Sequence, residues 1–254
     1  MMPSRPIECS EIGKELTLTL PKREDVVQVH KMHKSIRSWA IVSLLLGGVS
    51  IFAGGVLDPV WGIVMIIVAI LSWKVRIPAV FVIYSVIMGW AAVMNGVSVL
   101  VGGEVGWLVL ALVQVFWMVS LVKQFRKYSY LPLQKLFKSG KWPAHLDPPQ
   151  RDDVVTSRFA IAGIILAVTA LILLPSVLVG TIMLVAITKP SQTPPQMVWL
   201  LSGIVDVAVL ALGFSCAALL SKNDRRGWAI GGVVVSALVL IGWLGFLLLA
   251  NFTR

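Results

Sequence analysis

The chain has 254 residues, of which 57% are hydrophobic and 13% charged, and its mean hydropathy is +0.89. Soluble domains are roughly 45–50% apolar and about 25% charged, so the composition argues against a soluble protein and predicts a polytopic membrane protein. The net charge of +10 comes from basic residues between the apolar runs, without a nucleic-acid-binding motif. We therefore expect contact with anionic lipid headgroups and no nucleic-acid partner.

The apolar runs are continuous, which favours an all-α membrane helix bundle over a barrel of alternating strands. Residues 1–37 form a polar tail, within which 24–34 could form a short helix. A four-span membrane domain, 38–122, follows it. Its predicted spans, separated by turns at Asp58-Pro59, Pro78 and Asn95-Gly96, are about 39–56, 60–73, 79–94 and 107–122.

A basic connector, 123–157, links the two membrane domains. Its segment 130–138 has helical spacing, with Leu133, Leu136 and Phe137 on one face. This short helix could lie in the membrane interface or pack on the protein itself. In the first case the residues expected to contact lipid headgroups are Lys135, Lys138 and Lys141.

The last domain, 158–254, contains three predicted spans at about 159–187, 197–220 and 228–250. The first is longer than the ~20 residues needed to cross a bilayer. Pro175 lies inside it and should kink it, so we expect one kinked span rather than two half-spans.

Seven spans with a cytoplasmic N-terminus and an external C-terminus satisfy the positive-inside rule. In that arrangement all but two of the 22 Lys and Arg residues lie on the cytoplasmic side, and the exceptions are Lys189 and Arg254. Splitting the fifth span would send the cluster from Lys222 to Arg226 outward, which is why the seven-span arrangement is preferred.

A short phrase of an Arg, an aromatic residue, Ala-Ile and then a small residue opens three of the spans, at Arg37, Arg158 and Arg226. We interpret it as the way in which these helices begin at the cytoplasmic face. Small residues allow close backbone approach between membrane helices. The glycines predicted to lie at such contacts are Gly47, Gly54, Gly89, Gly163 and Gly231.

These phrases resemble the opening signature of small bacterial membrane modules known only as domains of unknown function. The sequences concerned are Trp39-Ala40-Ile41, Phe159-Ala160-Ile161 and Arg226-Gly227-Trp228-Ala229-Ile230-Gly231-Gly232. Residues 37–130, with Asp58-Pro59 and Gln124-Phe125-Arg126-Lys127-Tyr128, resemble uncharacterised four-span bacterial membrane proteins. The resemblance implies a prokaryotic cytoplasmic (inner) membrane and carries over no activity.

Asp206 is the only ionisable residue predicted to lie deep in a span, about 14 Å from the outer end of its helix. Such residues are functional candidates by default. Ser202 lies one turn earlier, and Gln114, or Thr169, should lie at a similar depth and could be a partner. The site could bind a proton or cation, or it could be a hydrogen-bonded carboxyl that fixes helix packing.

The chain has no HExxH, CxxC, GxSxG or phosphate-loop motif, and all three histidines lie outside the predicted spans. We therefore expect no enzymatic activity, no cofactor and no metal. The expected function is that of a scaffold or accessory subunit that packs against other membrane subunits. The alternative is a small ion or solute transporter that uses Asp206.

Overall fold

The computed structural model describes residues 23–52, 59–102, 105–131, 133–138, 140, 142–146, 152–187, 195–221 and 225–252. All regular structure within these ranges is helical, as predicted. The eight helices are α2 (Arg23–Phe52), α3 (Pro59–Val75), α4 (Ala79–Gly102), α5 (Val105–Tyr128), α6 (Leu133–Lys138), α7 (Asp152–Ile187), α8 (Pro195–Leu220) and α9 (Arg226–Phe252).

Six of the described helices, α2, α4, α5, α7, α8 and α9, are long and apolar enough to cross a membrane. Helix α3 is apolar but has only 17 residues. A backbone in lipid must satisfy its own hydrogen bonds, and an α-helix does so within one segment. The chain is therefore a multi-pass helical membrane protein.

Two boundaries differ from the sequence-based expectation. The segment 24–34 is not a separate short helix, because α2 runs without a break from Arg23 into the first apolar run. The predicted turn at Asn95-Gly96 is wrong, because α4 continues through both residues to Gly102. The side chain of Asn95 hydrogen-bonds to a neighbouring helix, so this residue needs no turn to satisfy its polar groups.

The repeated phrase marks the start of a helix in only one of its three copies. Helix α9 begins at Arg226, but α2 begins well before Arg37 and α7 begins at Asp152, before Arg158. The phrase therefore marks the entry into an apolar run rather than the first helical turn. Helix α7 continues through Pro175 as one helix, as expected for a single element in this segment.

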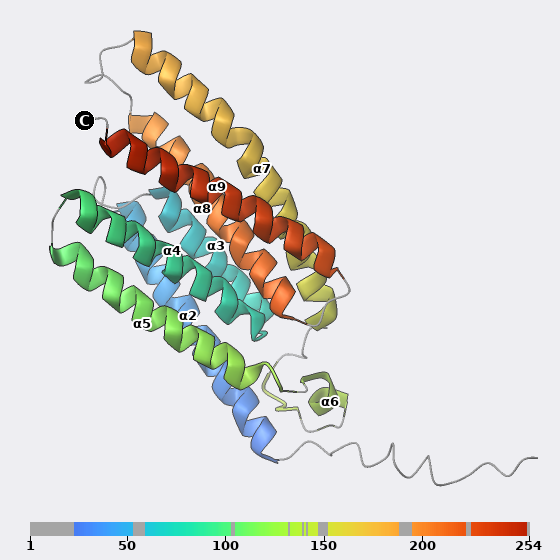
Figure 1. Ribbon diagram of the computed structural model, residues 1–254. Coiled ribbons are helices and arrows are strands. Elements are labelled where there is room, and N and C mark those ends of the chain that lie inside the picture. The colour runs from blue at the N-terminus through green and yellow to red at the C-terminus, as the bar shows by residue number, and fades with distance from the viewer. Residues whose placement is uncertain are drawn as a thin grey trace, which may run out of the picture.

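The helices pack as a pair α2–α3, a pair α4–α5 and a group of three, α7–α9 (Figure 1). Helix α8 joins these groups, because it packs on α7 and α9 and also on α4 and α3. Its buried residues and those of α4 form the centre of the core; the largest are Phe81, Ile83, Tyr84, Ile87 and Phe214.

Helices α2, α7 and α9 begin at one end of the bundle, where α6 also lies (Figure 1). Described residues at this end include Arg37, Lys74, Lys123, Arg158 and Arg226, all of which are exposed. Arg76 lies in the turn after α3 and has a φ of 45°, in the left-handed region that lets the chain reverse direction within a few residues. We call the end of the bundle at which these basic residues lie the basic end.

Candidate functional site

Helix α8 is the packing centre of the protein because small residues recur along it. Ala208, Ala211, Ala217 and Ala218 are fully buried. Gly203 faces Val60 of α3, and Gly213 faces Ile83 of α4. Small side chains let helix backbones approach closely, which is the main way in which membrane helices gain contact. The sequence therefore allows α8 to take four helices as neighbours.

The tightest contact of α8 is at Ser215, which lies between a glycine on each of two neighbouring helices. A Cβ atom at Gly163 of α7 or at Gly232 of α9 would overlap the Ser215 Oγ. At Gly163 that Cβ would also lie 3.1 Å from the backbone O of Ala211. Ser215 is fully buried, and its hydroxyl meets no hydrogen-bond partner among the described residues. Steric fit therefore defines this contact.

The carboxyl of Asp206 lies on α8 and is only 6% exposed. Ser202 lies one turn earlier on the same helix and is partly buried. The structure thus brings together two of the three predicted polar residues simply because they share a helix face. A carboxyl buried on the helix that joins the groups can either hold them together or take part in binding an ion.

Gln114, the predicted third member, has a partner of its own. Its Oε1 accepts a hydrogen bond of 2.7 Å from Asn95 Nδ2, which links α5 to α4 within the first half of the chain. Thr169, the other candidate, is exposed and donates to Ile165 O of its own helix at 2.8 Å. Both groups therefore have partners away from Asp206.

A second buried polar group, which the sequence analysis missed, lies on α3 and α4. The Tyr84 hydroxyl is fully buried and is hydrogen-bonded to Ser72 Oγ at a distance of 2.9 Å. Ser72 also bonds to Val68 O, one turn back on its own helix. The indole of Trp39 lies beside Tyr84 and meets Trp117 edge-on, with ring centroids 5.7 Å apart. The signal that could have revealed this group is a single Tyr within an apolar run.

The predicted packing glycines occupy different environments. Gly47 meets Gly62 of α3 so closely that a Cβ at Gly47 would lie 2.7 Å from the Gly62 carbonyl oxygen. Gly89 faces the flexible side chain of Met118, and a Cβ at Gly231 would lie 3.3 Å from Ile164 Cδ1, a tight contact with the end of a side chain rather than with backbone. Gly54 lies outside the described residues. The closest backbone approaches are thus at Gly47 and at Gly163, described above.

The connector helix α6 places its apolar residues against the protein. Leu133 and Leu136 are 3% and 1% exposed, whereas Phe137 and Lys138 point outward. This arrangement favours the second alternative for the segment, packing on the protein itself. The side chains of Lys135 and Lys141 are not among those that the structure describes, so their contact with headgroups stays a prediction.

Two histidines meet where the connector touches α2. His145 Nε2 and His30 Nδ1 are 3.3 Å apart, and Trp142 packs edge-on against the buried ring of His33. Within the described residues, no group of three or more His, Cys, Asp or Glu side chains is placed to hold a metal ion. The contacts of His30 with His145 and of His33 with Trp142 join the connector to α2.

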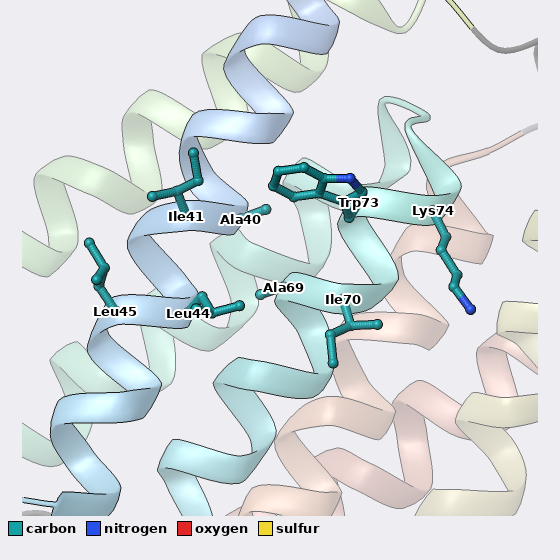
Figure 2. Close-up of a pocket in the computed structure, with 8 residues that line it drawn as sticks. All are labelled: Ala40, Ile41, Leu44, Leu45, Ala69, Ile70, Trp73 and Lys74. Carbon is teal, nitrogen blue, oxygen red and sulfur yellow. The ribbon is translucent and has the colours of Figure 1, made fainter.

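A groove of about 310 Å³ opens between α2 and α3 near the basic end (Figure 2). Eight residues line it: Ala40, Ile41, Leu44, Leu45, Ala69, Ile70, Trp73 and Lys74. Seven of these residues present apolar side chains, and Asp206 and Ser202 are not among the eight. The groove and the buried carboxyl are therefore separate features.

Comparison of the chain with protein-family models, with curated proteins and with solved structures finds no match.

Proposed function

We propose that the protein is a non-enzymatic scaffold or accessory subunit, which acts by packing its helices against other membrane subunits. The observation that carries this proposal is the exposure of α5. This helix packs chiefly on α4, and within it only Ala111, Leu121 and Tyr128 are buried. Its exposed apolar side chains form a face that a partner helix could cover.

The outward face of α5 has the spacing of a helix-packing surface. Leu108, Leu112, Phe116 and Val119 follow one another at intervals of three or four residues, and each is exposed. Phe116 is 71% exposed and stands near the middle of this face. Large aromatic side chains are the residues that most often anchor an interface.

Site-specific photocrosslinking in native membranes tests this proposal. A photoreactive amino acid at Phe116 should give an adduct with a second polypeptide. The same amino acid at Ile172 of α7, which is 63% exposed on another helix, is the matched control and should label lipid only. Lipid adducts alone at both positions, together with a monomer in mild detergent, would contradict the proposal.

We further propose that α3 crosses the membrane, which gives seven spans, a cytoplasmic N-terminus and an external C-terminus. A helix of 17 residues is about 25 Å long, close to the ~30 Å hydrocarbon thickness, so slight thinning of the bilayer suffices. The basic end then faces the cytoplasm, as the positive-inside rule requires. The resemblance noted above favours a prokaryotic cytoplasmic membrane.

Reporter fusions test this topology. Alkaline phosphatase fused after Arg254 should be active, because it would be exported, whereas the same reporter fused after Ser221 should be inactive. The reverse pattern, or activity at both positions, would contradict the seven-span arrangement.

The buried carboxyl of Asp206 supports a second candidate, a small ion or solute transporter. Asp206 lies on the helix that packs on α3, α4, α7 and α9, and transporter sites commonly lie where two helical halves meet. If this alternative holds, reconstituted protein should carry an ion or proton flux that Asp206→Asn abolishes. Absence of flux in the wild type, or unchanged flux in the variant, would exclude the role.

A further inference from the structure

The groove between α2 and α3 lies on the basic-end side of the point at which the two helices are closest. Their backbones are closest at Gly47 and Gly62. Nearer the basic end, the buried Ala40 and Ala69 form a floor between the helices. The larger side chains on either side are exposed and form the walls; they are Ile41, Leu44, Leu45 and Ile70.

The groove is elongated along the helices. Residues 40–45 of α2 rise by about 7.5 Å, which is more than one helical turn. Figure 2 shows the ring of Trp73 pointing from the last turn of α3 toward Ala40, so that it closes the groove at the basic end. Tryptophan is enriched at the level of the lipid headgroups, which places this end of the groove at the membrane interface.

Basic side chains flank the closed end. Arg37 precedes Ile41 by four residues and Leu44 by seven, so it lies on the same face of α2 as the groove wall. Lys74 belongs to the groove lining, and Figure 2 shows its side chain on the side of α3 opposite the Trp73 ring; its flexible four-carbon stem can turn the ammonium toward the headgroup level. Both side chains are exposed. Arg76 donates from Nε to the Trp73 carbonyl at 3.0 Å and adds a third positive charge nearby.

We propose that this groove binds one anionic phospholipid. An acyl chain lies against Ala40 and Ala69, and the headgroup phosphate is held by Arg37 and Lys74. The charge pattern selects this occupant, since an apolar channel that ends in basic residues matches an amphiphile with a negative head. A partner helix would match the apolar walls but would leave the two cations without a counterion. The proposal does not depend on the scaffold function.

The test uses the full-length protein in vesicles of phosphatidylcholine with a minor fraction of phosphatidylglycerol that carries a photoactivatable acyl chain. Adducts mapped by mass spectrometry should concentrate on the groove walls, Ile41, Leu44 and Ile70. Leu112 and Phe116 of α5 are at least as exposed and do not line this groove, and they serve as internal controls. The photoactivatable phosphatidylcholine analogue should label both regions equally.

Charge variants separate specific binding from general lipid contact. Arg37→Gln and Lys74→Gln should each lower the labelling ratio of groove to α5 about fivefold, the usual contribution of one basic residue near an anionic membrane surface. Lys123→Gln and Arg226→Gln remove equally exposed charges elsewhere at the basic end and should leave the ratio unchanged. All four positions are on the surface, and circular dichroism checks that each variant is folded.

Blocking the groove gives a second, independent readout. Leu44→Trp should fill the groove without contacting Arg37 or Lys74. It should abolish the preferential labelling of the groove walls by the anionic lipid. Three results would overturn the proposal: equal labelling of the groove and of α5 by the anionic lipid, equal preference for the phosphatidylcholine analogue, or adducts of the groove walls with a second polypeptide.

Discussion

The contact between Gly47 and Gly62 makes a strong prediction because the sequence offers a matched control next to it. A Cβ added at Gly47 would lie 2.7 Å from the Gly62 carbonyl oxygen and 3.3 Å from the Ile66 backbone nitrogen. A Cβ added at Gly48 would meet nothing within 4 Å. Both glycines lie within α2, so Gly47→Ala and Gly48→Ala differ only in what the new methyl group contacts.

The size of the effect follows from these distances. Replacing Gly by Ala inside a helix gains about 1 kcal/mol of helix propensity, and this gain is common to both variants. At Gly47 the new methyl group overlaps backbone that cannot rotate away, so α2 and α3 must separate. Overpacking of this kind costs about 1–3 kcal/mol. The free energy of unfolding should therefore be about 1–3 kcal/mol lower for Gly47→Ala than for Gly48→Ala.

Reversible unfolding in mixed micelles, driven by a denaturing detergent and followed by circular dichroism, measures this difference. Gly62→Ala should reproduce the loss, because its Cβ would lie 2.7 Å from the Gly47 carbonyl oxygen. Equal unfolding free energies for Gly47→Ala and Gly48→Ala would refute the close contact between α2 and α3.

Two further predictions concern buried hydrogen bonds and use the same assay. Tyr84→Phe removes the hydrogen bond between Tyr84 and Ser72, but Ser72 keeps its bond to Val68 O. Stability should therefore fall by only about 0.6 kcal/mol, the average for such bonds in membranes, and a loss above about 2 kcal/mol would contradict this. Gln114→Leu leaves the Asn95 amide without its partner and should lower the free energy of unfolding by about 1–3 kcal/mol. Replacing both Asn95 and Gln114 by Leu should lower it less. Equal losses for the single and the double variant would contradict the pairing of these two side chains.

The helical fold could be predicted from the sequence because a membrane imposes one rule on every span. Each long apolar run must form its own backbone hydrogen bonds, so run length and composition suffice to locate a helix. The same rule explains the error at Asn95-Gly96. This dipeptide favours a turn in water, but within an apolar segment continuation of the helix costs less than exposed backbone groups, and Gln114 takes up the Asn95 amide.

The polar contacts could be predicted only in part, because the sequence gives depth along a helix but not which helix is its neighbour. Gln114 and Asp206 are at similar expected depths, yet α5 packs chiefly on α4 and Gln114 bonds to Asn95. Ser202 and Asp206 share a face of one helix, which helical spacing does reveal. Tyr84 and Ser72 come from different helices, so their bond required the tertiary structure.

Packing by small residues shows the same limit. A stripe of small residues marks a face that can approach another helix, but not which partner it meets. Gly47 meets a glycine, whereas Gly163 meets Ser215. Gly96 follows Ser85, Gly89 and Ala92 at intervals of three or four residues, yet a Cβ at Gly96 would meet no described atom beyond its own helix backbone within 4 Å. Close contact therefore depends on both helices, and one sequence stripe describes only one of them.

The central claim is that α8 is a packed structural helix whose carboxyl does not face a water-filled path. The most direct measurement is the labelling of Asp206→Cys by a membrane-impermeant thiol reagent, applied from either side to vesicles of protein without native cysteines. Packing predicts no labelling at this position, whereas Arg226→Cys, at an exposed site on α9, should react readily. Labelling at position 206 as fast as at position 226 would show that Asp206 faces water. It would contradict the packed role of α8 and favour the transporter function.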